Sequence, residues 1–287
     1  MPGFLSIECL NALSEAALLF FLGVGLTLIF GIMRIVNFAH GALYMLGAFI
    51  GYSVARLTGS FWLALLLAPT AVGLLGSLFE FGILRRLYRR DASAFLMVTF
   101  GFALVLGELA RLIWGSQSLH VSLPSALSGV VFLFSLPFPV YRLFLIASGA
   151  AAALFLWQFL ERTRFGLVIR ATSQNPEMMQ ALGTDVALVR RAVFAIGCGL
   201  AGLGGVLAAP LVTASLGMAV RVIIDAFVIV IIGGMGSFAG SLLGALLIAF
   251  VQVFGEYYFP DLALALMYLV MLLVLVLRPG GLLGKEA

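Results

Sequence analysis

Charged residues are scarce in this sequence. Asp, Glu, Lys and Arg make up 10% of its 287 residues, whereas hydrophobic residues make up 63%. An ordinary globular domain carries about 25% charged residues. This shortage excludes the class of soluble globular proteins and predicts an all-α polytopic membrane protein, with residues 1–287 forming a single transmembrane domain. An excess of Arg in cytoplasmic loops accounts for the net charge of +4, so nucleic-acid binding is not expected.

Cysteine and histidine are also scarce, with two residues of each. Cys9 and Cys198 are too few and too far apart in sequence to form a disulfide framework or a metal site. His40 and His120 are far apart in sequence and have no Ser or Cys partner at a motif position. We therefore expect no catalytic residues, no metal and no cofactor.

A phosphate-binding loop and a signal peptide are missing as well. The Gly284-Lys285 pair lacks the spacing and the hydroxyl of a P-loop, so ATP hydrolysis by this chain is not expected. Residues 1–18 contain no Lys or Arg, which argues against a signal peptide. Their only charges are Glu8 and Glu15, and an acidic start indicates an external N-terminus.

Long apolar runs occupy most of the chain. We expect a membrane-spanning helix at residues 13–31 and a second one that follows a break at 33–41 and ends at residue 54. Further spans are expected at residues 61–84, 95–114, 141–159, 186–209, 222–254 and 263–277. The run at 222–254 is too long for one span and is broken at 233–240. Counting both broken regions as hairpins gives about nine crossings, and the number falls to eight if either is re-entrant. Residues 115–139 carry no charge and are predicted to form an external loop.

Arginine clusters predict the orientation. One cluster follows the third span, at Arg85, Arg86, Arg89 and Arg90, and Arg278 with Lys285 follows the last. Cytoplasmic loops are enriched in Arg and Lys. The sequence therefore predicts a cytoplasmic C-terminus and a periplasmic N-terminus.

The longest polar segment is residues 161–191. It holds eight of the 28 ionisable residues, five of them Arg, between apolar runs, so it is predicted to be a cytoplasmic loop. Asn175 can cap a helix at Pro176 that ends near Leu182, and Gly183 can stop that helix in a left-handed conformation. So short a helix needs packing to be stable. Its apolar residues either dock on this chain's own membrane ends or serve a partner.

Two polar or glycine-rich breaks interrupt apolar runs, one in each half of the chain, and such discontinuous segments are typical of transport sites. Candidate substrate-pathway residues are Arg34, Asn37, His40, Gly41, Gly233, Gly234, Gly236 and Ser237. If the first break continued as a helix, Arg34, Asn37 and His40 would share one face. Those three either line a path or bond to neighbouring carbonyls and hold the turn.

Four blocks in the sequence resemble a known family. They are residues 31–41 with 44–48, residues 170–183, residues 233–237 with Gly240 and Gly244, and residues 279–284. In this order they closely resemble the motifs of permease subunits of branched-chain amino acid ABC transporters, and they cover nearly the full length of the chain.

The resemblance implies a multi-pass permease of the bacterial inner membrane. It implies as partners a second permease subunit, two cytoplasmic ATP-binding subunits and a periplasmic substrate-binding protein. The residues expected to couple this chain to the ATP-binding subunits are Arg170, Ala171, Asn175, Pro176, Glu177, Met178, Met179, Leu182 and Gly183.

Two alternatives stay open. Related permeases carry urea, amides or aromatic acids, and the sequence does not name the substrate. An ion-coupled secondary transporter is a different class, in which Glu108, Arg111 and Asp225 would be the functional groups, because ionisable residues inside a membrane are functional candidates.

Overall fold

The computed structural model describes residues 2–88, 90–133 and 136–284, without the side chains of residues 2–4. Arg89 and Lys285, two residues of the predicted orientation signals, lie outside this set. The elements in chain order are α1 (Pro2–Met33), α2 (His40–Thr58), α3 (Phe61–Gly82), the 3-10 turn η1 (Leu84–Leu87), α4 (Ala92–Trp114), the turn η2 (Ser125–Leu127), β1 (Val130–Leu133), β2 (Leu136–Pro139), α5 (Val140–Arg162), α6 (Arg164–Gln174), α7 (Pro176–Ala181), α8 (Val186–Ala208), α9 (Met218–Gly233), α10 (Phe238–Tyr258), the turn η3 (Pro260–Leu262) and α11 (Ala263–Leu277).

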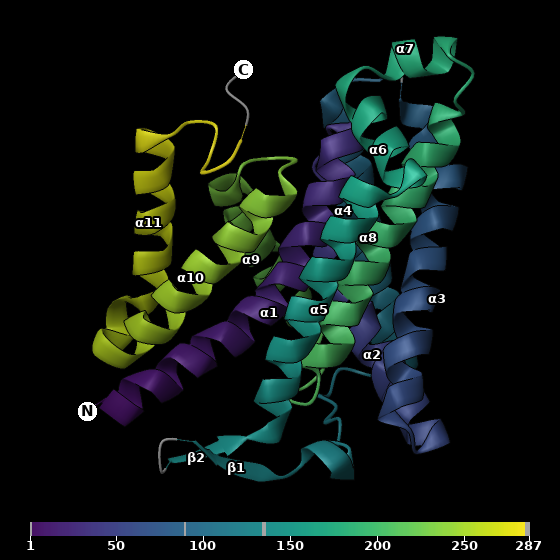
Figure 1. Cartoon of the computed structure of the whole chain (residues 1–287). Helices are drawn as coiled ribbons and strands as arrows, with labels where there is room; N and C mark the ends of the chain where they lie inside the picture. Colours follow the sequence, from purple (N-terminus) through teal and green to yellow (C-terminus); the bar gives the residue numbers. More distant parts are fainter. Residues whose placement is uncertain (1, 89, 134–135, 285–287) are drawn as a thin grey trace.

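The helices form one bundle with two distinct ends (Figure 1). The short helix α7 lies at one end, together with the end of α11, and we call this the α7 end. The antiparallel strands β1 and β2 lie at the other end, near the start of α1, and we call this the hairpin end. The predicted loop at 115–139 therefore contains a strand pair that the sequence did not predict.

Helix α1 is the centre of the bundle. It contacts α5, α8, α9 and α10, and α8 in turn packs against α2 and α3. The α2–α8 contact is close: a Cβ atom added at Gly205 would lie 2.0 Å from the carbonyl oxygen of Tyr44. The absence of a side chain at this glycine of α8 therefore permits tight packing of the two helices.

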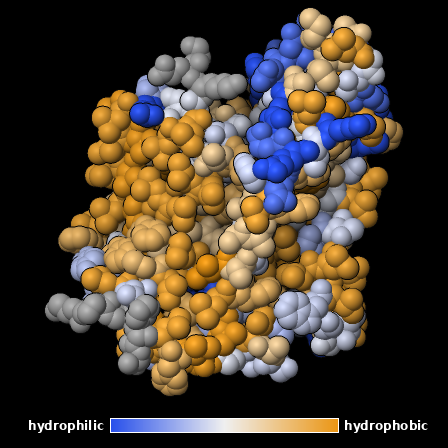
Figure 2. Space-filling view, viewed as in Figure 1, coloured by the Kyte–Doolittle hydropathy of each residue, from blue (hydrophilic) through white to orange (hydrophobic). Residues whose placement is uncertain are grey.

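The outer helices expose apolar side chains. Leu74 of α3, Leu104 of α4 and Leu272 of α11 are more than half exposed. Figure 2 shows hydrophobic residues across the face formed by α10 and α11, while hydrophilic residues gather near the α7 end. A large apolar perimeter of this kind is stable in lipid, where it meets hydrocarbon instead of water.

Seven described helices are long and apolar enough to cross a membrane. The prediction of eight or nine spans was therefore slightly too high. Helix α9 has 16 residues, which at about 1.5 Å each falls short of a hydrocarbon core of about 30 Å. Helix α2 has 19 residues, but His40, Ser53 and Arg56 lower its hydropathy.

Candidate functional site

The first predicted break is present between α1 and α2. Helix α1 ends at Met33, α2 begins at His40, and residues 34–39 are not helical. Arg34 has a φ of 53°, the one positive φ at a non-glycine residue among those described. A left-handed residue of this kind ends an α-helix, because the chain leaves the helical path there.

The three polar residues of this break do not share a face. Arg34 is exposed, whereas Asn37 and His40 are fully buried. The Asn37 Oδ1 accepts a hydrogen bond from the Ala39 amide at 3.1 Å. His40 Nε2 lies 3.0 Å from the Leu22 carbonyl oxygen, to which it donates in the Nε2–H tautomer. His40 thus bonds to a carbonyl, whereas the buried Asn37 Nδ2 and His40 Nδ1 have no hydrogen-bond partner among the described residues. The choice between holding the turn and lining a path stays a prediction.

Asn37→Ala is expected to lower the stability of the folded protein by about 1 kcal/mol, because the buried Ala39 amide loses its acceptor. The measurement is the apparent melting temperature of the purified protein in detergent. Asn37→Ser is the matched control, since a hydroxyl can still accept from an amide two residues on. Unchanged stability with reduced transport would contradict the structural role and favour a pathway role.

The second break joins α9 to α10. Gly234 and Gly236 take positive φ angles of 98° and 84°, which only glycine adopts without strain. Ser237 caps α10, because its Oγ accepts from the Gly240 amide at 3.0 Å. The two breaks lie side by side: a Cβ added at Gly31, near the end of α1, would lie 3.4 Å from the Cα of Gly236.

Glycines also bring other segments to these breaks. Gly41 lies against α9, where an added Cβ would be 2.2 Å from the Ala219 carbonyl oxygen. The C-terminal segment bonds to the end of α9: the Leu282 amide donates to the Ile232 carbonyl at 2.8 Å, and the Leu283 amide donates to that of Gly233 at 3.1 Å. Residues 233–237 and 279–284, two of the four blocks that resemble a known family, are therefore in direct contact.

The polar loop carries the predicted short helix. Asn175 Oδ1 accepts from the Met178 amide at 2.9 Å, α7 runs over Pro176–Ala181, and Gly183 has a φ of 86°. These features confirm the predicted cap, helix and stop. The sequence did not predict α6, which precedes α7 and fills much of the rest of the loop.

One part of the polar loop is bonded to the end of α5, and another part has exposed apolar side chains. Arg170 donates to the Leu160 carbonyl and forms an ion pair with Glu161 at 3.1 Å, and the Ala171 carbonyl accepts from the Asn175 amide at 3.0 Å. In α7 and directly after it, Met178 is 56% exposed and Leu182 is 72% exposed. These two side chains therefore do not dock on the chain's own membrane ends, which was one of the two alternatives for this surface.

A small cavity joins the polar loop to the first break. It has a volume of about 220 Å³ and is lined by residues 32–34, residues 172–177 and Arg190. The Arg190 guanidinium lies 4.6 Å from the centre of the Tyr88 ring, and the Tyr88 hydroxyl donates to Glu80. Arg34 of the predicted pathway and Pro176 of the predicted coupling loop thus share one cavity, although they are far apart in sequence.

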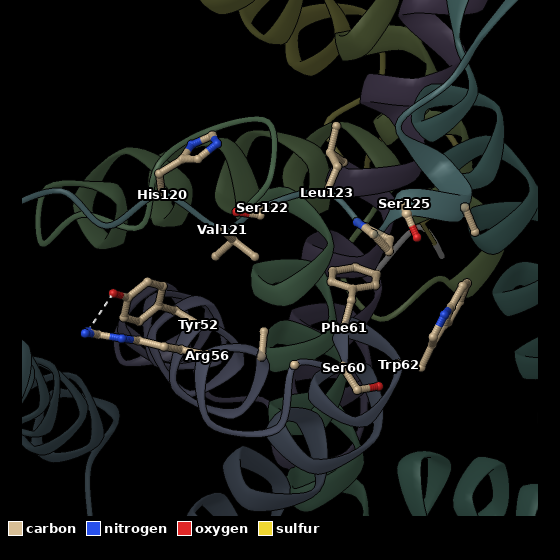
Figure 3. Close-up of a pocket in the computed structure, with 14 residues that line it drawn as sticks. Tyr52, Arg56, Ser60, Phe61, Trp62, His120, Val121, Ser122, Leu123 and Ser125 are labelled. Atoms are coloured by element: carbon tan, nitrogen blue, oxygen red, sulfur yellow. Dashed lines mark hydrogen bonds between the residues drawn. The ribbon is translucent and has the colours of Figure 1, made fainter.

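A larger pocket of about 590 Å³ lies at the hairpin end (Figure 3). Tyr52 and Arg56 of α2 lie on one side, where Arg56 Nη1 donates to the Tyr52 hydroxyl at 3.1 Å, and His120 lies across from them. This pocket was not predicted from the sequence, because an isolated Arg near a helix end is common.

The residues of the alternative ion-coupled site are not brought together. Arg111 Nε donates to Glu108 Oε2 at 2.9 Å on an exposed face of α4, and the charges of these two residues act on each other. Asp225 lies in a separate cavity, which Glu15 and Arg221 also line. In the part of the chain that the structure describes, no three His, Cys, Asp or Glu side chains lie close enough to hold a metal ion.

These features define a multi-pass α-helical membrane protein with a broken-helix core and a structured polar loop at one end. Residues 9–275 match the family model described as the permease component of branched-chain amino acid transport systems. The chain belongs to this family.

Curated relatives agree with the match. The chain is 29% identical to the high-affinity branched-chain amino acid transport system permease protein BraD of Pseudomonas aeruginosa, over 97% of this chain and 95% of that protein. It is 26% identical to the corresponding permease LivH of Escherichia coli, over 92% and 90%. A solved structure, PsaBC from Streptococcus pneumoniae in complex with Fab, has a similar fold, with a TM-score of 0.52, 14% identity and coverage of 93% of this chain and 89% of that chain.

Proposed function

We propose that this chain is the membrane-spanning subunit of an ATP-driven importer of the bacterial inner membrane, and that it carries branched-chain amino acids. The observation that carries the proposal is the cavity shared by Arg34 and residues 172–177. Because both segments line this cavity, a movement of the polar loop would change the surroundings of the break between α1 and α2. In this role the chain is a permease, and ATP is hydrolysed by partner subunits.

The α7 end faces the cytoplasm in this proposal. Arg85 lines a small cavity together with Asp185 and Arg191, so the two Arg-rich segments lie at the same end. Arginine is enriched in cytoplasmic loops. The two ATP-binding subunits would then contact α7, and the second permease subunit would lie beside this one in the membrane.

The hairpin end faces the periplasm and receives the substrate-binding protein. Arg56 and His120 line its pocket and offer hydrogen-bond donors to acidic side chains of that partner. The binding protein sets most of the substrate selectivity, so urea, amides and aromatic acids remain alternative substrates within the same class.

Reconstitution tests the proposal. Proteoliposomes that contain this chain, a second permease subunit and the two ATP-binding subunits are expected to accumulate L-leucine only when ATP and the binding protein are both present. Vanadate should stop the uptake. The control is a complex with an ATP-binding subunit that does not hydrolyse ATP. Uptake driven by an ion gradient alone would overturn the proposal in favour of an ion-coupled transporter.

A further inference from the structure

A second cavity at the hairpin end holds three charged residues. It has a volume of about 620 Å³ and lies between α1, Tyr44 of α2, the segment after α8 and the first half of α9. The segment after α8 is tied to the hairpin end, because the Leu119 amide donates to the Ala214 carbonyl at 2.9 Å. Glu15, Arg221 and Asp225 line the cavity.

The three charges form one group. Arg221 and Asp225 are four residues apart on α9 and lie on the same face of the helix, and Glu15 of α1 lines the same cavity. None of the three forms an ion pair within the described residues. The three side chains give the cavity wall binding groups of both signs.

The rest of the cavity wall is mainly apolar. Leu18 and Leu22 of α1 lie opposite Met218 and Val222 of α9, and Thr213 with Ser215 adds hydroxyl groups. The cavity thus combines one cation, two carboxylates and an aliphatic surface. A ligand that fits all of them carries a negative group, a positive group and an apolar side chain.

We propose that this cavity binds the zwitterionic part of an amino acid in transit, with Arg221 holding its α-carboxylate and Glu15 with Asp225 holding its α-ammonium group. The aliphatic side chain packs on the leucine-lined wall. This assignment rests on the proposed transport function and adds to it the residues that recognise the charges of the substrate. An amine without a carboxylate leaves Arg221 unpaired, and a carboxylic acid without an ammonium group leaves Glu15 and Asp225 unpaired. The cavity therefore discriminates strongly against both kinds of molecule.

Transport by the reconstituted complex is the first test. Arg221→Gln and Asp225→Asn are each expected to lower the initial rate of L-leucine uptake per assembled complex by about tenfold, the effect of losing one hydrogen bond between charged groups. Arg221→Lys keeps the positive charge and should retain more of the rate. Arg111→Gln and Asp261→Asn are the matched controls, because both residues are exposed and lie outside the cavity.

Direct protection is the second test and needs no ATP. Val222→Cys, in a background that carries Cys9→Ser, places a thiol in the cavity wall of the purified complex. L-leucine is expected to slow its modification by a small thiol reagent. At the same concentration 3-methylbutylamine, which lacks the carboxylate, and 4-methylpentanoate, which lacks the ammonium group, should not. Arg221→Gln should remove the protection by L-leucine.

The outcomes separate this inference from the proposed function. A wild-type complex without ATP-driven uptake would overturn the proposed function, while the protection experiment would still decide whether the cavity binds the amino acid. A wild-type complex that transports L-leucine, with Arg221→Gln and Asp225→Asn variants that match it, would overturn the cavity assignment alone. Equal protection by all three probes would overturn it as well.

Discussion

Replacing the two exposed apolar residues near α7, Met178→Ser with Leu182→Ser, is expected to lower ATP-driven uptake at least tenfold without unfolding the protein. Both side chains are more than half exposed, so their loss removes little internal packing. Each would contribute about 1.5–3 kcal/mol if a partner buried it fully. Half of this contribution, summed over the two residues, exceeds the 1.4 kcal/mol that corresponds to a tenfold change in affinity.

The measurement is co-purification of the ATP-binding subunits together with ATP-driven uptake. Gln180→Ser is the matched control, since Gln180 is an exposed polar residue of the same helix. Gly183→Val tests the helix by another route, because a β-branched residue at a φ of 86° is strained by about 1 kcal/mol or more. Normal co-purification and uptake in the double variant would show that α7 does not bind the ATP-binding subunits.

Gly205→Leu is expected to prevent correct folding. An added Cβ at this position would lie 2.0 Å from the Tyr44 carbonyl oxygen and 2.9 Å from the Ala48 amide nitrogen. Both atoms belong to the backbone of α2, so no side-chain rotation relieves the clash, and α2 and α8 must separate. Overpacking of a well-packed core costs about 1–3 kcal/mol even where side chains can adjust.

Gly101→Leu is the control for this substitution. Gly101 is also helical, but a Cβ added there meets no atom within 4 Å. Since Leu has a higher helix propensity than Gly, this variant should be as stable as the wild type or more stable. Size-exclusion profiles and melting temperatures in detergent compare the two. A monodisperse, thermally stable Gly205→Leu protein would contradict the close α2–α8 packing.

The sequence predicted the features that depend on neighbouring residues. Asn175, Pro176 and Gly183 act within one or two turns of a helix, so their cap, start and stop could be read from the order of residues. The break before His40 was predicted in the same way, from polar residues that interrupt an apolar run. The family could also be recognised, because its motifs are contiguous blocks.

Features that depend on distant contacts were not predicted. Asn37 and His40 were placed on one face with Arg34 by assuming a continuous helix, but the positive φ of Arg34 turns the chain away from that path. Helix α6 was missed although its sequence is amphipathic, with Phe165, Val168 and Ile169 at helical spacing, and its contacts are with α5, α7, α8 and α1. The cavity around Glu15 and Asp225 was also missed, since it joins residues from opposite ends of the sequence.

The central position of α1 determines when the protein can complete its assembly during synthesis. Helix α1 packs against α10, which begins at residue 238, 205 residues after α1 ends at residue 33. At a translation rate of about 5–20 residues per second, the ribosome needs about 10–40 s to make the intervening chain. During that interval the surface of α1 that α10 will cover is not yet covered by α10. Helix α1 is therefore synthesised well before it acquires all of its neighbours.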